Sequence, residues 1–486
     1  MTTTSFYWHD YETFGIDPAL DRPSQFAGLR TDTEFNPIEK PLVIYCRLAA
    51  DSLPHPDACL ITGITPQTVE QHGVCEAEFI ARIHEQMSRP NTCSLGYNTL
   101  RFDDEVTRNC LYRNFYDPYA REWQNGNSRW DLIDTVRAAQ ALRPEGIQWP
   151  VTEALEHNAP PSPSFRLDQL TIANGITHEA AHDAVSDVYA TLGMAQLLNK
   201  VQPKLYQFLQ AHRFKQEASD LLQLGRFKPV VHVSSKYSAR NNCLAIVLPI
   251  CKHPTNANGI IVYDLSYDPE PLLSLSAEEI KYRLYTPSKD LLDGETRVPL
   301  KTVHTNKCPV LAPINVIRTE DACRLALDLD LCYARIAIIK AAIGLSEKIT
   351  AVFGFPDNAT ESVDPDLAIY RGGFFTDADK QKMAKIRAST PDQLALSKFN
   401  FTDARLAEML FRYRARNYPE TLSQAEATQW REFCVNRLTG KVKGAGITLA
   451  NYFARLAALK TENADIELIC ALEDYARDKM QQLKMG

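Results

Sequence analysis

Two acidic side chains stand inside the first apolar run of the chain, Phe6–Glu12, and this pair restricts the fold strongly. The run predicts a β-strand, where successive side chains alternate between faces, so Asp10 and Glu12 share one face. Carboxylates placed together on a hydrophobic strand repel each other unless a cation neutralises them, and oxygen ligands suit magnesium or manganese. Asp-x-Glu is also common in solvent-facing strands and turns, so the pair alone does not establish a metal site.

The pattern that follows predicts an α/β region over roughly the first 200 residues. Expected strands are Phe6–Tyr11, Gln25–Thr31, Leu42–Arg47 and Thr92–Asn98, and expected helices are Glu78–Met87, Asp104–Phe115 and Ala184–Leu198. Pro160–Pro163 reads as a loop.

The character of the sequence changes near Lys228. Three β-rich runs follow, Pro229–Ser234, Leu244–Ile250 and Ile260–Leu265, the last after an Asn258-Gly259 turn. They predict a small sheet or barrel over about 215–350, then a linker at Phe353–Asp366. Helical periodicity dominates beyond it, with Leu406, Met409, Leu410 and Tyr413 on one side of a helix that begins near Thr402.

Composition bounds the class of protein. At 486 residues the chain has room for about three domains, and its 45% hydrophobic and 23% charged residues are ordinary for a globular protein. No apolar stretch approaches a membrane span, and the N-terminus lacks a secretion signal. The twelve cysteines form no Cys-x-x-Cys pair, which argues against a zinc or thioredoxin-like site and favours a reducing cytoplasm. The net charge of −7 leaves room for a local basic groove.

A second acidic element lies at Asp103-Asp104-Glu105, after a strand that we expect to end near Asn98. A helix is expected to begin at Asp103 or Asp104. Asp is a favoured helix N-cap, so one acid could cap the helix while the other reaches a metal.

The third element is His182-Asp183-Ala184-Val185-Ser186-Asp187. Asp187 falls inside a helical pattern and His182 just before it, so the acid could bind a metal while the histidine stands at the rim within reach of a water. A capped helix with an exposed histidine is the alternative for this stretch alone.

Together the three elements, in this order, resemble the DEDDh exonuclease superfamily. The resemblance implies that Asp10, Glu12, Asp103 and Asp187 bind two Mg²⁺ ions, with Mn²⁺ as a substitute, and that His182 is the general base. Two cations about 4 Å apart would activate water and neutralise the departing 3′ oxygen, and an imidazole accepts a proton near neutral pH.

Longer strings sharpen the match to the bacterial exonuclease I family. They are His9–Gly15, Asp17–Phe26, Arg101–Arg108, Tyr112–Ala120, Ser128–Asp131, Ala141–Ile147, Phe165–Leu167, Cys308–Leu311 and Tyr413–Asn417. The resemblance implies a ribonuclease H-like α/β nuclease domain (1–200), a small SH3-like β-barrel domain (201–352) and an α-helical C-terminal domain (353–486). It also implies 3′→5′ degradation of single-stranded DNA to 5′-mononucleotides, in repair and recombination, by a monomer.

Contacts to single-stranded DNA require stacking surfaces and phosphate partners. Candidates, besides Glu12 at the metal site, are Arg108, Tyr112, Arg113, Tyr116, Trp130, Phe165 and Arg166. The equally weighted alternative for Arg108–Arg121 is a helix with core aromatics and solvated arginines. The run Arg412, Arg414, Arg416 reads more often as a solvated face.

The family resemblance further implies docking of the acidic C-terminal tail of single-stranded-DNA-binding protein, with Arg143 as one contact; the alternative is a solvated arginine. Two other functions remain open: a DEDDh exoribonuclease or oligoribonuclease, and a non-catalytic DNA- or protein-binding factor on a nuclease-like fold. All five catalytic positions being filled disfavours the latter.

Overall fold

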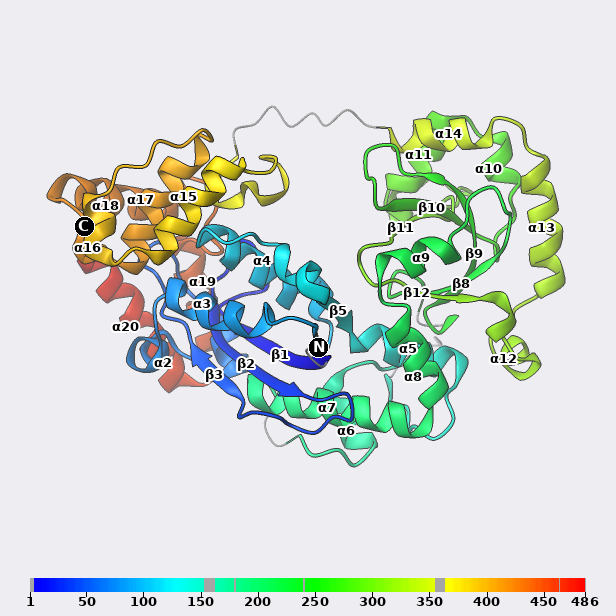
Figure 1. Cartoon of the computed structure of the whole chain (residues 1–486), viewed down its shortest axis with the longest axis horizontal. Coiled ribbons are helices and arrows are strands. Elements are labelled where there is room, and N and C mark those ends of the chain that lie inside the picture. The colour runs from blue at the N-terminus through cyan, green and yellow to red at the C-terminus, as the bar shows by residue number, and fades with distance from the viewer. Residues whose placement is uncertain are drawn as a thin grey trace. The chain divides into compact units, whose positions relative to one another are not determined.

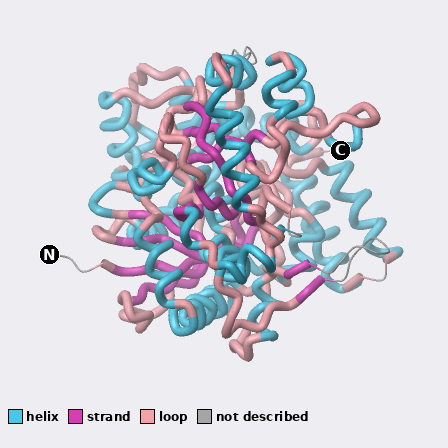
Figure 2. The backbone as a smooth tube through the Cα atoms, turned by 90° about the vertical axis from the view of Figure 1, so that its right-hand side faces the viewer, coloured by secondary structure: helices cyan, strands magenta, loops and turns pink. Residues whose placement is uncertain are grey.

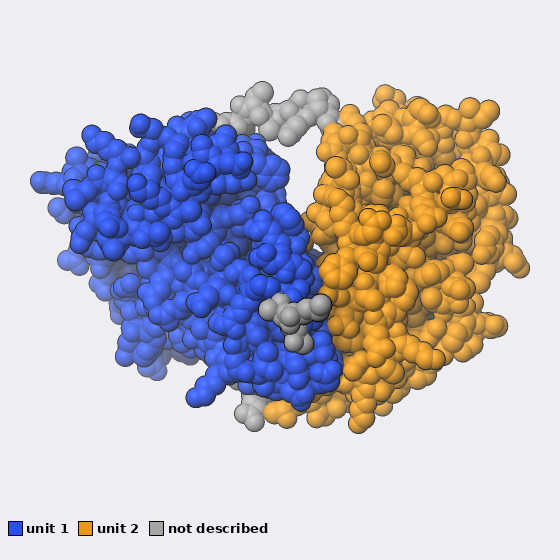
Figure 3. Space-filling view, in the orientation of Figure 1, with its two compact units in different colours: residues 1–128, 178–189, 359–486 blue, residues 129–177, 190–358 orange. Residues whose placement is uncertain are grey.

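The structure is a computed structural model that describes residues 4–152, 162–178, 181–238, 241–354, 363–462 and 464–485. Its elements are shown in Figure 1. The chain forms two compact units (Figure 3): one comprises residues 1–128, 178–189 and 359–486, the other residues 129–177 and 190–358. The segment of the predicted His182–Asp187 motif therefore belongs to the same unit as the N-terminal strands and the C-terminal helices.

The first sheet has the strand order β3-β2-β1-β4-β5. Its strands are β1 (Ser5–Thr13), β2 (Pro23–Thr31), β3 (Leu42–Tyr45), β4 (Thr92–Gly96) and β5 (Ser128–Asp131). β1 runs antiparallel to β2 and parallel to β4. In Figure 2, β1 is the first element of the chain. The four expected strands are confirmed; β4 ends before Asn98 because that residue takes a positive φ of 66°.

Helices of the first unit pack on this sheet and on one another. They are α1 (Pro56–Thr62), α2 (Pro66–His72), α3 (Glu76–Met87), α4 (Asp103–Arg113), the start of α7 (Ala184–Val201), α15 (Asp377–Ala388), α16 (Pro391–Leu396), α17 (Arg405–Asn417), α18 (Gln424–Leu438), α19 (Leu449–Thr461) and α20 (Ile466–Gln482). One core lies between the sheet and α3 and α4, around Phe26, Phe79 and Val106. A second joins α3 and α4 to the C-terminal helices through Phe115 and Met409.

The second unit is built on a five-stranded sheet of order β11-β10-β9-β8-β12. Its strands are β8 (Val230–Val233), β9 (Leu244–Lys252), β10 (Gly259–Asp264), β11 (Leu300–His304) and β12 (Val310–Pro313). Its helices include α5 (Leu132–Leu142), α6 (Leu167–Ala173), α8 (Pro203–Ala211), α9 (Lys215–Leu221), α10 (Glu270–Ser274), α11 (Ala277–Tyr285), α12 (Thr319–Arg324), α13 (Leu329–Ala341) and α14 (Leu345–Phe353). The predicted β-rich region is confirmed.

Two local expectations change. Ser162–Pro163 is not a loop but a short strand, β7, which pairs with β6 (Val151–Thr152); Pro160 and Pro161 lie outside the described residues. The expected linker Phe353–Asp366 has structure at both ends, since α14 reaches Phe353 and a 3₁₀ helix, η7, spans Pro365–Tyr370; residues 355–362 lie outside the described part.

None of the helices in the described part of the chain combines the length and apolar character that crossing a membrane requires.

Candidate active site

The acids singled out in the sequence come together in the first unit. β1 carries Asp10 and Glu12, α4 begins at Asp103, and Asp187 lies in the first turn of α7. One ligand atom from each of Glu12, His182 and Asp187 lies within 4.8 Å of the other two. Chain segments about 170 residues apart thus converge on one small volume.

Asp10 and Asp103 stand beside this trio. Asp103 is buried, and its Oδ1 accepts the backbone N–H of Tyr11 at 2.9 Å, which fixes the start of α4 against β1 between the two acids of that strand. The charges of Asp103, Glu12 and Asp187 all act on Asp10, so the four carboxylates form one electrostatic cluster.

Burial and mutual repulsion raise the pKa of acids in this cluster. Burial raises the pKa of Asp10 well above its usual range, and repulsion from Asp103 and Glu12 adds to this effect. Burial, followed by repulsion from Asp187 and Asp103, raises the pKa of Glu12 to about 8. Carboxylates that resist ionisation in this way, with oxygen donors only, fit hard divalent cations such as Mg²⁺ or Mn²⁺.

The Asp187 carboxylate is held at both oxygens. Oδ1 lies 2.6 Å from Nε2 of His178, and Oδ2 accepts the backbone N–H of His182 at 3.2 Å. His182 itself is exposed and takes a positive φ of 68°, a conformation costly for a non-glycine residue and typical of functional sites. Its backbone therefore anchors the acid while its side chain remains at the rim.

Sequence reasoning missed His178, as well as Gln25 on β2, whose side chain contacts Asp183 and the backbone of Ala184. His178 precedes Asp187 by nine residues, in a stretch without helical or strand periodicity. Gln25 lies more than 150 residues from Asp183 and Ala184. The only signal in the sequence was the place of Gln25 in the family-like string Asp17–Phe26.

The adjacent acids of α4 have different partners. Asp104 forms a buried ion pair with Arg121, with Oδ1 and Nη2 2.6 Å apart. The N-cap position belongs to Phe102, so the expectation that one acid caps the helix is wrong. One acid faces the cluster, and the other neutralises an enclosed guanidinium.

Three predicted DNA contacts on α4 are core residues. Arg108 pairs with Glu122 and Glu105, both at 2.7 Å. Arg113 pairs with Glu76 at 3.0 Å, inside the protein. The ring of Tyr112, which is 3% exposed, lies parallel to that of Phe375 at 5.9 Å. In this structure Arg108, Tyr112 and Arg113 have partners within the protein, and their predicted contacts with DNA stay predictions.

The remaining stacking candidates differ in access. Trp130 is buried against Tyr206, at a centroid distance of 5.0 Å, and its predicted contact with DNA stays a prediction. Tyr116 is half-buried beneath the Arg387 guanidinium, 4.3 Å from the ring centroid. Phe165 is half-buried under Arg137, and Arg166 is exposed and pairs with Asp168 at 2.9 Å.

A pocket of about 140 Å³ opens near the C-terminal end of α4. Phe374, which no sequence pattern pointed to, lines it and is 87% exposed. Tyr116, Tyr119, Lys380 and Arg387 also line it. Exposed aromatic surface next to two cationic side chains is the composition expected of a site for a nucleobase and a phosphate.

Arg143 is neither freely solvated nor isolated. Its guanidinium donates to Asp321 at 3.0 Å and to the Val316 carbonyl at 2.9 Å. Arg318 and Arg324 also pair with the buried Asp321, at 2.8 and 3.3 Å. Arg318 also pairs with Glu145 and Glu320, at 2.8 and 3.2 Å, so three carboxylates accompany the three arginines at this surface.

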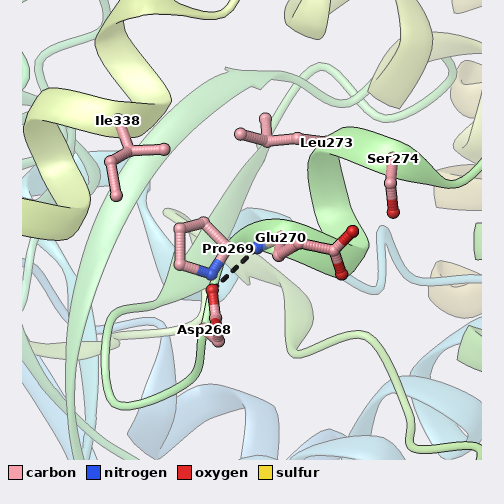
Figure 4. A pocket seen from close by; sticks show the side chains of 6 residues that line it. All are labelled: Asp268, Pro269, Glu270, Leu273, Ser274 and Ile338. Atoms are coloured by element: carbon pink, nitrogen blue, oxygen red, sulfur yellow. Dashed lines mark hydrogen bonds between the residues drawn. The ribbon is translucent and has the colours of Figure 1, made fainter.

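The second unit also has a pocket of about 380 Å³ beside α10, shown in Figure 4. Pro269, Leu273 and Ile338 form its apolar wall, and Asp268 accepts the backbone N–H of Glu270 at 3.0 Å. Its charged lining side chains, Asp268 and Glu270, are acidic, so it is unsuited to phosphate.

Comparison with known proteins gives three consecutive matches to family models. The Exonuclease model covers residues 7–194, the Exonuclease I SH3-like domain covers 213–355, and the Exonuclease I C-terminal domain covers 363–479. They confirm the predicted order of an α/β nuclease domain, an SH3-like domain and a helical domain. The exact boundaries at 200/201 and 352/353 stay predictions.

Relatives that match nearly the whole chain agree with these family models. The chain is 47% identical over 479 residues to the Exodeoxyribonuclease I of Escherichia coli strain K12, with 98% of each chain covered. It resembles the solved complex of E. coli Exonuclease I with a dA16 oligonucleotide (TM-score 0.93, 46% identity, 98% and 100% coverage). It also resembles a solved ExoI/SSB-Ct complex (TM-score 0.89, 45% identity, 99% and 100% coverage). The chain therefore belongs to the exonuclease I family.

Proposed function

We propose that this protein is an exodeoxyribonuclease that degrades single-stranded DNA from its 3′ end and releases 5′-mononucleotides. The observation that carries the proposal is the convergence of Glu12, His182 and Asp187 within 4.8 Å, with Asp10 and Asp103 acting on the same cluster. Family membership supports it, since the E. coli relative is an Exodeoxyribonuclease I and its solved complex holds an oligonucleotide.

In this proposal Asp10, Glu12, Asp103 and Asp187 bind two divalent cations. When bound, such ions lower the pKa of an attacking water and neutralise the departing 3′ oxygen. His182, exposed at the rim, accepts the proton of that water. His178 and the His182 backbone keep the Asp187 carboxylate in one orientation, so that it is ready for its ligand role.

Dependence on a divalent metal follows from the exonuclease family and the ligand set, and we propose Mg²⁺ as the ion, with Mn²⁺ as a substitute. All four acids offer hard oxygen donors, which Mg²⁺ and Mn²⁺ prefer. One solved relative is the zinc-bound form of the E. coli ExoI–ssDNA complex (TM-score 0.92, 46% identity), which supports a divalent site.

We place the strand between the carboxylate cluster, at the start of α4, and the pocket near the C-terminal end of that helix. The helix begins at Asp103 in the cluster and reaches Tyr112 about 14 Å further on, at about 1.5 Å per residue. The pocket with Phe374, Lys380 and Arg387 opens beyond that point and is the proposed site for a base upstream of the cleaved bond. Tyr116, Phe165 and Arg166 remain candidate contacts.

The surface of Arg143, Arg318 and Arg324 around Asp321 is the proposed docking site for the acidic C-terminal tail of single-stranded-DNA-binding protein. The relative solved as an ExoI/SSB-Ct complex supports the choice of this partner. Action in the cytoplasm, in repair and recombination, is part of the proposal.

The decisive experiment compares labelled single-stranded DNA, RNA and duplex, with and without Mg²⁺. We expect Mg²⁺-dependent release of 5′-mononucleotides from single-stranded DNA, blocked by a 3′-phosphate and unaffected by a 5′ block. Faster digestion of RNA would favour the exoribonuclease alternative, and binding without cleavage would favour a non-catalytic factor.

The role of His182 has its own test. His182→Ala should lose about 10²–10⁴-fold in single-turnover rate at neutral pH, the usual contribution of a general base. Its rate should recover in part as the pH rises towards 10, because hydroxide replaces the base, whereas Asp187→Ala should show no such recovery. Cleavage by His182→Ala at the parent rate near neutrality would contradict the assignment.

A further inference from the structure

Gln25 is a buried amide next to the proposed metal site. It is 2% exposed and lies on β2, where it pairs in register with Glu12 of β1 on one side and with Tyr45 of β3 on the other. The three residues form a row across three strands, with a proposed metal ligand at one end.

The Gln25 side chain bridges this row to the N-terminus of α7. Its Nε2 donates to Asp183 Oδ1 at 3.3 Å and to the Tyr45 hydroxyl at 3.0 Å. Its Oε1 accepts the backbone N–H of Ala184, the first residue of α7, at 3.2 Å. That N–H has no partner within the helix, so Gln25 supplies one.

Asp183 is hydrogen-bonded in turn to the first turn of α7. Its Oδ2 accepts the N–H of Ser186 at 3.3 Å, and its carbonyl accepts the N–H of Asp187 at 3.0 Å. Asp183 therefore stands between His182 and Asp187 and is bound on one side by Gln25 and on the other by the first turn that carries Asp187.

We propose that Gln25 is a positioning residue that sets the distance between Glu12 on the sheet and the segment His182–Asp187. The inference rests on the proposed function. Glu12 and Asp187 are separated by 175 positions in sequence, and Gln25 is hydrogen-bonded to the α7 N-terminus while being the direct strand neighbour of Glu12.

A neutral amide suits the position between the Asp183 carboxylate and the backbone N–H of Ala184. It donates to a carboxylate and accepts from an N–H at the same time, which neither a carboxylate nor a hydrocarbon side chain can do. A glutamate would keep the acceptor but lose both donor contacts, and it would face Asp183 with a like charge.

The test uses Gln25→Met, which keeps the size and removes all three hydrogen bonds, in the full-length protein. The kcat on single-stranded DNA should fall about 10–100-fold, as for other groups that orient metal ligands, while KM for DNA stays within about twofold. Two readouts need no DNA: calorimetric Mn²⁺ binding should weaken by a similar factor, and amide hydrogen exchange in 182–187 should accelerate.

Tyr45→Phe is the matched control, because it removes only the Gln25 contact that does not lead to α7. It should keep kcat, Mn²⁺ affinity and exchange near the parent values. Gln25→Glu is the second variant and should also lose kcat and Mn²⁺ affinity. If Gln25→Glu binds Mn²⁺ more tightly than the parent does, Gln25 does not act by positioning the segment His182–Asp187.

The proposal is overturned if folded Gln25→Met keeps the parent kcat and exchange in 182–187, or if Tyr45→Phe loses as much as Gln25→Met. If Gln25→Met fails to fold, the kcat and the exchange in 182–187 of Gln25→Glu are compared with those of the parent and of Tyr45→Phe instead. An inactive parent protein would instead contradict the proposed function, while exchange and Mn²⁺ binding would still report on Gln25.

Discussion

Asp103 and Asp104 show how two adjacent acids of the same type serve different ends. Asp103 faces the carboxylate cluster and is fixed by the Tyr11 N–H, whereas Asp104 neutralises the enclosed Arg121. Asp103→Asn should keep the fold and lose activity by about 10²-fold or more, since it weakens a metal ligand. Asp104→Asn should leave Arg121 uncompensated and lower the free energy of unfolding by about 3–5 kcal/mol. Single-turnover rates and denaturant titrations of both variants check this; loss of stability in Asp103→Asn alone would reverse the assignment.

The pKa of Glu12 predicts how stability depends on pH and metal. Burial and repulsion raise this pKa from 4.5 to about 8. Between pH 4.5 and 8, Glu12 is therefore protonated in the folded protein and ionised in the unfolded chain. The free energy of unfolding of the metal-free protein should therefore fall as the pH rises from about 4.5 to 8, by about 1.4 kcal/mol per pKa unit at most. Glu12→Gln should reduce this dependence, of which Asp10 keeps a part, and should be more stable than the parent at pH 8 without metal, although inactive.

Thermal unfolding at pH 5 and pH 8, with EDTA or with Mg²⁺, measures this effect. Mg²⁺ should raise the Tm of the parent more at pH 8 than at pH 5, because the ligands are then ionised, and should have little effect on Glu12→Gln. A parent Tm in EDTA that rises between pH 5 and 8, or that falls no more than the Tm of Glu12→Gln, would contradict this prediction.

At the level of single residues, the spacing of residues in the sequence predicted those placements that depend on local backbone geometry. Alternation along a strand placed Asp10 and Glu12 together, and helical periodicity placed Asp187 in a first turn. His178 and Gln25 could not be found in this way. His178 lies in a stretch without regular periodicity, and the contact of Gln25 with Asp183 depends on how distant segments meet.

Helix α4 shows why an element can be located from the sequence while the surroundings of its faces cannot. Its expected start near Asp103 or Asp104 is confirmed, but nearly every residue is buried, since the sheet lies on one side and C-terminal helices on the other. A helix covered all round has no polar stripe to reveal which arginines are solvated. The C-terminal partners of α4, about 260–300 residues away, were beyond any local pattern.

The pocket at the end of α4 gives a prediction with opposite outcomes for two aromatic residues. Phe374→Ala should weaken single-stranded DNA binding by about 1–3 kcal/mol, the usual contribution of one stacked base, with little change in stability. Tyr112→Ala should instead destabilise the fold by about 3–5 kcal/mol, because its ring is buried against Phe375. Fluorescence titrations with an oligonucleotide in EDTA and thermal unfolding separate the two effects; unchanged DNA affinity in Phe374→Ala would remove this residue from the strand's path.

Across the first unit, buried ion pairs tie the C-terminal helices to the nuclease region. Asp51, wholly buried, accepts from Arg416 of α17 at 2.8 Å and lies 3.3 Å from Arg437 of α18. Arg416 also reaches Asp366 at 2.7 Å. The arginine run 412–416 is thus not the solvated face that its sequence suggests, since its anionic partners lie up to 365 residues away.

This network predicts that the two regions unfold together. Burial alone would raise the pKa of Asp51, but Arg416, Arg437 and Arg22 outweigh it and hold that pKa far below its usual range. The contribution of Asp51 to stability is therefore present above the unfolded pKa near 3.8 and is lost as the pH falls below that value.

Asp51→Asn should lower the free energy of unfolding by about 3–5 kcal/mol at pH 7, because it leaves buried guanidinium groups without their anionic partner. Asp377→Asn, which alters a fully exposed partner of Lys380, should change it by less than about 0.5 kcal/mol. Denaturant titrations at pH 7 and pH 3 measure both variants, and the difference between Asp51→Asn and the parent should shrink at pH 3. A loss in Asp51→Asn no larger than in Asp377→Asn would mean that apolar packing alone joins the C-terminal helices to the nuclease core.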